Sequence, residues 1–292
     1  METLRRLCPA KINLYLRVLG RRSDGYHELV TVMQPLSLAD ELTVTPGGPG
    51  LRFSCDHPGL PPGEGNLVWR AARAFEQAAG RRLNVHLTLR KRIPVAAGLG
   101  GGSSDAGAAL LALNRLADGP LSQEDLHRLA RQLGADVPFF LEDGPAVARG
   151  VGEILTPLDL SPYWYVLLNP GVPLSTRWVY ENLDVGGLAP DPGLQSWDQD
   201  HPGDWVKNDL EGVAVRRLPE LAARILQLKE LGAAAAAVSG SGPTVFGLFF
   251  GLAGARSAAA IIRRTFPGWL AVARGLTRHE LPADWENDVW ML

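Results

Sequence analysis

A run of glycines within residues 94–110 constrains this chain more than any other feature of its sequence. Four of the five residues at 98–102 are glycine. Residues 85–89 alternate apolar and polar side chains, which predicts a strand, and residues 106–113 repeat apolar side chains at helical spacing. Glycines let backbone N–H groups approach a ligand, and the start of a helix adds free donors and a positive dipole end. The segment therefore predicts an anion site, with phosphate as the usual anion.

Two better-known phosphate loops do not fit this segment. No lysine follows the glycines, as a P-loop requires. Ser103 takes the place of the third glycine in the dinucleotide-binding fingerprint. The strand at 84–92 alternates like a sheet with one wet face, not like a buried parallel strand. A tight turn without a ligand stays an alternative, although glycines so closely spaced cost chain entropy.

The composition argues against several classes of protein. A net charge of −2 speaks against a nucleic-acid partner or an anionic-membrane surface. Cys8 and Cys55 form neither a zinc-binding spacing nor a disulfide framework, which fits a reducing compartment. The N-terminus lacks the apolar core of a signal peptide, and the apolar region 233–253 is interrupted at 239–244. We therefore expect a cytoplasmic enzyme without a membrane span.

The predicted elements indicate an α+β fold in two parts. In the first part, residues 5–19 predict a strand with a break at Pro9. Ser122 begins a helix with a capping box, and Gly134 is placed to end that helix in a left-handed conformation. The other predicted elements of this part are strands at 29–37, 41–46, 145–149 and 153–158, a loop up to Asn66 and a helix at 67–79.

The second part follows a proline-containing boundary at 157–163, so we expect domains at 1–158 and 159–292. Its order of strand, helix, two strands, helix and strand is a split-βαβ or ferredoxin-like pattern. A linker at 184–204, rich in Gly, Pro and Asp, is the expected mobile loop. Ser175 is the expected N-cap of a short helix at 175–183. The other predicted elements are strands at 164–168, 233–238, 244–250 and 269–273 and helices at 218–228 and 255–266.

Lys11 and Asp136 are the candidate catalytic residues. A phosphate loop without its own lysine needs positive charge from elsewhere, and Lys11 lies at a strand start beside polar Asn13. Phosphoryl transfer also gains from a carboxylate that orients the acceptor hydroxyl, and Asp136 lies among small and apolar residues. A solvated strand-edge cation and a capping carboxylate are the structural alternatives, and the sequence favours neither interpretation.

Three other segments have both a functional and a structural interpretation. The loop at 239–243 allows close backbone approach to phosphates or to the glycine run, or is a simple hairpin turn. Tyr26 and His27 lie in a polar turn, where they could contact a nucleobase or face solvent. Residues 103–105 at the helix start could bind Mg²⁺ or phosphate, but Ser and Asp are also ordinary residues of a first helical turn.

The glycine-rich segment resembles the second motif of the GHMP kinases, named for galactokinase, homoserine kinase, mevalonate kinase and phosphomevalonate kinase. Residues 9–14 resemble the first motif and residues 239–246 the third, in the expected order. The resemblance implies a two-domain GHMP kinase fold: an N-terminal ribosomal-protein-S5-domain-2-like domain and a C-terminal ferredoxin-like domain. The active site would lie in the cleft between them.

Four segments resemble one group within this family, the kinases of a diphosphocytidyl methylerythritol in the non-mevalonate isoprenoid pathway. These segments are residues 9–16, 22–29, 133–140 and 150–157. The resemblance implies transfer of the ATP γ-phosphate to the 2-hydroxyl of the methylerythritol moiety, with Mg²⁺. No Glu matches the metal ligand of mevalonate kinases, so the metal ligands stay unassigned.

The resemblance also implies roles for the residues around the reacting groups. Asp136 would activate the hydroxyl, and Lys11 would hold the hydroxyl or Asp136 in place and balance charge, with Asn13 beside them. The residues that would bind ATP are Asn66, Leu67, Pro94, Ala96, Ala97, Gly98, Leu99, Gly100, Gly101, Gly102, Ser103 and Ser104.

A second set of residues would bind the cytidine substrate. His27 would recognise the cytosine, with stacking from Tyr26 and from an aromatic side chain of the helix at 175–183. We place that side chain at Tyr180, with Trp178 as the alternative. Further substrate contacts would come from Val151, Thr176, Ser239 and Gly240.

Three other functions compete with this prediction. Homoserine and mevalonate kinases share the motifs, but their acceptors have no base for the segment around His27. A catalytically inactive nucleotide binder would not need both Lys11 and Asp136. An RNA-binding module could share the α+β fold, but the chain has no basic patch. We therefore expect a small-molecule partner, no nucleic acid and no membrane, with a monomer or weak homodimer as the assembly.

Overall fold

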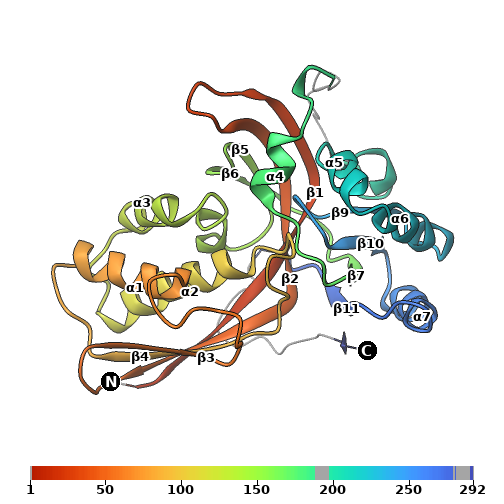
Figure 1. Cartoon of the computed structure of the whole chain (residues 1–292). Helices are drawn as coiled ribbons and strands as arrows, with labels where there is room; N and C mark the ends of the chain where they lie inside the picture. The colour runs from red at the N-terminus through yellow and green to blue at the C-terminus, as the bar shows by residue number, and fades with distance from the viewer. Residues whose placement is uncertain (1, 188–196, 279, 281–289, 292) are drawn as a thin grey trace.

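The computed structural model describes residues 2–187, 197–278, 280 and 290–291, and it contains two β-sheets (Figure 1). The first is a seven-stranded sheet in the order β3-β4-β2-β1-β8, and β5 and β6 extend it beside β2. Among its strands, only β3 with β4 and β1 with β8 pair in parallel. The strands are β1 (Leu4–Arg21), β2 (His27–Pro46), β3 (Leu51–Cys55), β4 (Val85–Arg90), β5 (Ala146–Gly150), β6 (Ile154–Pro157) and β8 (Lys207–Asn208).

The hairpin of β1 and β2 is the longest element of the first sheet. The predicted break at Pro9 is a shift in pairing register between Pro9 and Lys11, where proline offers no N–H to the ladder. The prediction of separate strands at 29–37 and 41–46 is wrong, because β2 runs through both without interruption. The intervening residues are buried and part of the ladder continues through them, so nothing forces the chain to turn.

A strand also lies where the sequence predicted only a loop. β3 pairs in parallel with β4, from Leu51 beside Val85 to Cys55 beside Leu89. Its residues are half-buried or exposed, as in an edge strand. Five residues with one partner carry a weak local signal, since the pairing depends on a strand that lies about thirty residues later in the chain.

Three helices cover one face of the first sheet (Figure 1): α1 (Leu67–Ala78), α2 (Gly101–Leu116) and α3 (Gln123–Leu133). The predicted capping box is confirmed, because Ser122 forms it with Asp125 at the start of α3. Asn66, which the sequence placed at the end of a loop, caps α1. The prediction that α3 ends in a left-handed conformation at Gly134 is wrong. Gly134 has φ 170° and ψ 156°, which is extended backbone, so the chain leaves α3 directly toward Asp136 and the short helix η1 (Pro138–Leu141).

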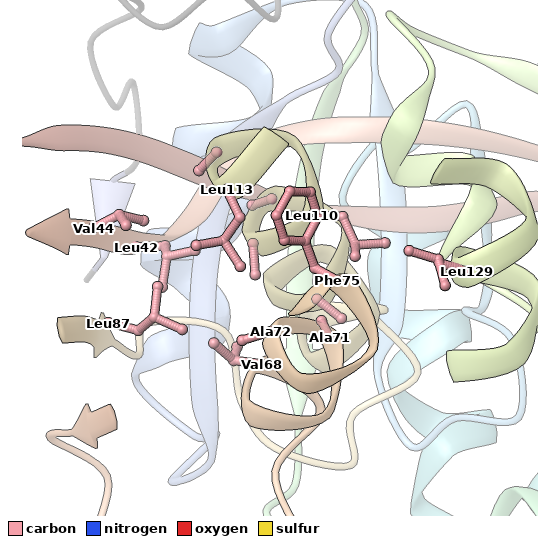
Figure 2. Packing of buried hydrophobic residues seen from close by; sticks show 14 of the residues in the cluster. Leu42, Val44, Val68, Ala71, Ala72, Phe75, Leu87, Leu110, Leu113 and Leu129 are labelled. Carbon is pink, nitrogen blue, oxygen red and sulfur yellow. The ribbon is translucent and has the colours of Figure 1, made fainter. Parts of the chain in front are cut away.

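The apolar core between these helices and the sheet fixes where the glycine run lies (Figure 2). Phe75 of α1 is fully buried, and burial of such a side chain stabilises the fold by about 1.5–3 kcal/mol. Because α2 is held by this core, its N-terminus has a fixed position. The residues labelled in Figure 2 are Leu42, Val44, Val68, Ala71, Ala72, Phe75, Leu87, Leu110, Leu113 and Leu129.

The second sheet has five strands in the order β12-β11-β7-β10-β9. Without β12, the four strands β7, β9, β10 and β11 are the first to fourth in the chain and lie in the spatial order 4-1-3-2. All their pairings are antiparallel, so the predicted ferredoxin-like pattern is confirmed. The sequence did not indicate α5 or β12. The elements are β7 (Trp164–Asn169), β9 (Ala235–Val238), β10 (Val245–Phe249), β11 (Trp269–Arg274), β12 (Trp290–Met291), α5 (Glu211–Arg217), α6 (Glu220–Glu230) and α7 (Leu252–Arg263).

The two sheets pack against each other through a shared apolar cluster. Ile12 and Leu14 of β1 belong to the same buried cluster as Leu167 of β7 and Phe246 of β10. Helices α5, α6 and α7 lie on the side of the second sheet away from the first (Figure 1). The short strand β8 belongs to the second half of the chain but pairs with β1 in the first sheet.

Helix α4 (Thr176–Glu181) lies beside the β1–β2 hairpin (Figure 1). The predicted cap is confirmed, because the Ser175 hydroxyl accepts a hydrogen bond from Trp178 N. The predicted linker at 184–204 contains the short helices η2 (Val185–Gly187) and η3 (Pro202–Asp204), and its residues 188–196 lie outside the described residues. The described part of the chain contains no helix with the length and apolar character of a membrane span.

Candidate active site

A cleft of about 1260 Å³ opens between the two halves of the chain, and most of the predicted site residues line it. Its walls combine the start of α2 and the β1–β2 hairpin with α4 and the loop before β10. The predicted residues that line the cleft are Lys11, Asn13, Tyr26, His27, Asn66, Leu67, Pro94, Ala96, Ala97, Gly98, Leu99, Gly100, Gly101, Gly102, Ser103, Asp136, Val151, Thr176, Tyr180 and Gly240.

Two predicted residues, Ser104 and Ser239, do not line the cleft. The Ser104 hydroxyl is buried without a hydrogen bond to the described residues, and Ser104 borders a separate cavity of about 30 Å³. Ser239 is fully buried; its hydroxyl donates to Gly98 O at 3.0 Å and accepts from Asn13 N at 3.4 Å. Ser239 therefore joins the loop before β10 to both the glycine run and β1.

The glycine run has the backbone geometry of an anion site. Gly98 and Gly100 adopt φ of 76° and 70°, in the left-handed region that favours glycine. A Cβ at Gly98 would lie 2.3 Å from Ser239 O, and one at Gly100 would lie 2.9 Å from Lys11 Cγ. Gly100 is also the N-cap of α2 and offers no side chain to the first helical N–H groups. Those donors and the positive helix end face the cleft at residues 101–103.

Lys11 lies directly against this loop and reaches Asp136. Its ammonium donates to Asn13 Oδ1 at 2.6 Å and lies 3.3 Å from Asp136 Oδ2. The Lys11 side chain is 5% exposed and that of Asp136 is 37% exposed, so the carboxylate is the partner open to the cleft. Asn13 Nδ2 donates to the Thr31 hydroxyl, which orients the amide oxygen toward Lys11. The structure thus brings together the two candidate catalytic residues.

Aromatic side chains line another part of the cleft. The rings of His27 and Tyr180 are stacked with centroids 5.1 Å apart, whereas Tyr26 is exposed. Partial burial, and to a lesser extent nearby Arg21, lowers the pKa of His27, which keeps the imidazole neutral at pH 7. Burial and then the Asp136 carboxylate raise the pKa of Tyr180. Trp178 does not line the cleft but packs under Arg217, so of the two alternatives Tyr180 faces the ligand space.

A second lysine, Lys91, reaches the cleft from the other side of the glycine run. Its ammonium pairs with Asp40 and lies 2.7 Å from Asp105 Oδ2. Lys91 and Asp40 were not among the predicted site residues, although Lys91 is one of only four lysines and lies three residues before Pro94. Asp105 was considered only as a possible ligand of Mg²⁺ or phosphate.

Burial raises the pKa of Asp105, and ion pairing raises the pKa of Lys91. Burial chiefly raises the pKa of Asp105 to about 8; the second carboxylate, Asp40, adds to the rise, and Lys91 opposes it. For Lys91, burial alone would lower the pKa, but the carboxylates Asp105 and Asp40 outweigh burial and raise it. Lys91 is therefore charged at any physiological pH.

Fold and cleft together define a two-domain phosphotransferase of the GHMP type, and family comparisons agree. The model of the GHMP kinases N-terminal domain matches residues 66–144, and the model of the GHMP kinases C-terminal domain matches residues 194–268. A solved homoserine kinase from Cytophaga hutchinsonii is 18% identical with a TM-score of 0.76, over 95% of this chain and 96% of that one, and supports the fold alone.

More similar relatives narrow the family. The 4-diphosphocytidyl-2-C-methyl-D-erythritol kinase of Citrifermentans bemidjiense is 44% identical over 94% of this chain and 99% of its own length. That of Syntrophus aciditrophicus is 45% identical over 92% and 97%. A crystal structure of 4-(cytidine 5'-diphospho)-2C-methyl-D-erythritol kinase is 43% identical with a TM-score of 0.82, covering 94% of this chain and all of that one. The chain belongs to the GHMP kinases and, within them, to the 4-diphosphocytidyl-2-C-methyl-D-erythritol kinase family; it is an ATP-dependent small-molecule kinase.

Proposed function

We propose that the chain transfers the γ-phosphate of ATP to the 2-hydroxyl of 4-diphosphocytidyl-2-C-methyl-D-erythritol, in the non-mevalonate pathway to isoprenoid precursors. One observation carries this proposal: a single cleft is lined both by a lysine–carboxylate pair against a phosphate-type glycine loop and by an imidazole–phenol stack. An acceptor with a base and a distant hydroxyl matches both features. The names of the relatives given above support the same substrate.

The glycine run holds the phosphates of ATP in this proposal. Two features make the glycine run suitable for phosphates: the start of α2 has no side-chain cap, and the backbone packs closely at Gly98 and Gly100. The uncapped helix start leaves N–H groups free for anionic oxygens. The adenine lies toward Asn66 and Leu67, at the edge of the same cleft. Asn66 Oδ1 accepts from Val68 N, so this wall is fixed by the helix cap of α1.

Asp136 and Lys11 act on the acceptor hydroxyl and the transferred phosphoryl group. Asp136 accepts or orients the hydroxyl proton, and Lys11 stabilises negative charge and holds Asp136 in place. The contact between Lys11 Cγ and the Gly100 position sets the lysine at the phosphate loop, while its ammonium reaches Asp136. Phosphoryl transfer depends mainly on such positioning, since little covalent help is required.

The cytosine lies against the aromatic side chains. A neutral His27 offers one donor and one acceptor to the base edge, which suits an uncharged amide-like ring. Tyr180 and Tyr26 supply aromatic faces for stacking. Val151, Thr176 and Gly240 also line the cleft, and the Thr176 hydroxyl lies 2.8 Å from that of Ser241. Ser239 contributes to substrate binding indirectly, because its hydroxyl holds the backbone of Asn13 and Gly98 in place.

Magnesium enters the proposal with the nucleotide. The described residues contain no group of three or more His, Cys, Asp or Glu side chains that could hold a metal ion, so we derive no step through a protein-built metal site. Mg²⁺ usually keeps its waters and binds through substrate phosphates, whose charge it neutralises. We further propose that residues 1–158 and 159–292 are the two domains and that the enzyme works in the cytoplasm, in keeping with its free Cys8 and Cys55.

An acceptor panel tests the function. The purified protein is incubated with ATP, Mg²⁺ and 4-diphosphocytidyl-2-C-methyl-D-erythritol, and with mevalonate, homoserine and galactose in parallel, while ADP and the phosphorylated product are followed by mass. We expect product with the cytidine substrate alone. Product with another acceptor would keep Lys11 and Asp136 but contradict the base pocket. ATP binding with no product from any acceptor would favour an inactive nucleotide binder.

A further inference from the structure

The second lysine set connects both ends of the glycine run to the sheet. Lys91 precedes the run, Asp105 is the fifth residue of the helix that follows it, and Asp40 lies on β2. The Lys91 ammonium contacts both carboxylates. Asp40 Oδ1 also accepts hydrogen bonds from the backbone N–H groups of Arg92 and Ile93. These four contacts converge on residues that neither the acceptor nor the catalytic pair uses.

This set, which we call the buried cluster (Asp40, Lys91 and Asp105), is almost closed to water and unbalanced in charge. The three side chains are 0%, 5% and 3% exposed. Two carboxyl groups share one ammonium, and Asp105 Oδ1 has no hydrogen-bond partner among the described residues. Buried charge without a partner is costly, so the cluster favours the retention of one proton.

The groups around Asp105 do not supply the missing positive charge. Besides Lys91 and Asp40, the titratable groups near it are the thiols of Cys8 on β1 and Cys55 on β3. Burial raises the pKa of both thiols, so both are neutral at pH 7. An extra proton on Asp105 is the remaining way to balance the cluster.

We propose that Asp40, Lys91 and Asp105 are positioning residues that fix both ends of the glycine run for ATP, and that the cluster does so best while Asp105 carries a proton. This inference rests on the proposed binding of ATP phosphates by the glycine run. Loss of the proton places a second negative charge beneath the phosphate site. That charge repels ATP, because it is buried where solvent screens it weakly.

Isothermal titration of the intact protein with ATP at pH 7 and pH 9 tests the proposal. The variants are Lys91→Met and Asp105→Asn, and the matched controls are Lys229→Met and Asp118→Asn, two exposed residues that do not line the cleft. We expect Lys91→Met to weaken ATP binding by on the order of tenfold at pH 7, because breaking a buried pair leaves carboxylates without a counter-charge. The wild-type dissociation constant should rise between pH 7 and pH 9, and Asp105→Asn should remove most of that rise.

The outcomes separate this inference from the proposed function. Wild-type protein that does not bind ATP would contradict the function itself. Normal ATP binding with the same pH dependence in wild type and Asp105→Asn would overturn the positioning role while leaving the function intact. Circular dichroism shows whether Lys91→Met is folded; if it is not, the Asp105→Asn comparison decides alone. An isosteric amide that abolishes a pH dependence is not explained by packing, since the shape of the side chain is retained.

Discussion

Two lysines lie on opposite sides of the same glycine run, and their surroundings differ. Lys11 faces one carboxylate, Asp136, which is 37% exposed and open to the cleft. Lys91 faces two carboxylates that are at most 3% exposed. The residue types are the same, but the first pair has a carboxylate that is open to the cleft, whereas all three side chains of the second set are buried.

The difference shows how environment assigns a role to an ion pair. A solvated carboxylate beside a fixed ammonium can exchange its partner for a substrate hydroxyl at little cost, which is what catalysis requires. A buried cluster cannot release its charges, because each unpaired charge would be stranded in a medium of low polarity. We therefore expect substitutions at the first pair to lower turnover and substitutions at the second to lower stability and ATP affinity.

The largest expected effect is that of Asp136→Asn. The amide keeps the shape but loses the ability to accept the hydroxyl proton, so kcat should fall by about 10²–10⁴-fold, the usual worth of a general base. ATP affinity should stay near that of wild type. Steady-state kinetics with a parallel ATP titration measure both. Turnover close to the wild-type rate would remove Asp136 from this role.

Lys91→Met should have the largest effect on stability. Removing the shared ammonium leaves two buried carboxyl groups unpaired, which costs about 3–5 kcal/mol of unfolding free energy. Urea denaturation measures the loss, and Lys229→Met on α6 is the exposed control. If the two methionine variants were equally stable, the buried cluster would not hold the first sheet and α2 together.

His27→Ala should act on one substrate and spare the other. Loss of a hydrogen bond and of stacking at the base weakens the cytidine substrate by roughly tenfold. The dissociation constant of ATP should not change, because we expect ATP at the glycine run and Asn66 and not at His27. Calorimetric titration with each ligand measures the two affinities separately. Equal weakening of both would mean that the cytosine pocket is elsewhere.

A further expected effect is a pH dependence of stability that originates at Asp105. Its pKa in the folded protein lies above the unfolded value near 4, so the folded state binds more protons between these values. The unfolding free energy contributed by this group therefore falls as the pH rises toward 8, with a slope of at most ~1.4 kcal/mol per pH unit. Denaturation at pH 5 to 8 should show a flatter slope for Asp105→Asn than for wild type or Asp118→Asn. An unchanged slope would contradict the assignment.

Local signals explain most of what the sequence could predict. The capping box at Ser122, the cap at Ser175 and the closely spaced glycines each fix backbone within a few residues, and all three lie as predicted. The order of the three motifs and the split-βαβ pattern predicted the two-domain architecture.

The rest depends on contacts between distant parts of the chain. β3 is a strand only because β4 lies beside it, and Lys91 meets Asp40 across 51 positions of sequence. Gly134 was assigned a left-handed cap from its position after α3, but the path toward η1 requires extended backbone there. No single-sequence pattern indicates that Ser104 faces a second cavity while Ser103 faces the cleft.

One measurement compares the two lysines most directly: single-turnover phosphate transfer to the cytidine substrate at saturating ATP, by rapid quench, for Lys11→Met and Lys91→Met side by side. We expect Lys11→Met to lose on the order of 10²-fold or more in the rate constant, because charge stabilisation at the reacting group is removed. Lys91→Met should recover to within roughly tenfold of wild type once ATP is saturating, because a positioning defect that acts on ATP binding is overcome by concentration. Equal losses in the two variants, or a larger loss at Lys91, would contradict the division of roles between the two sides of the glycine run.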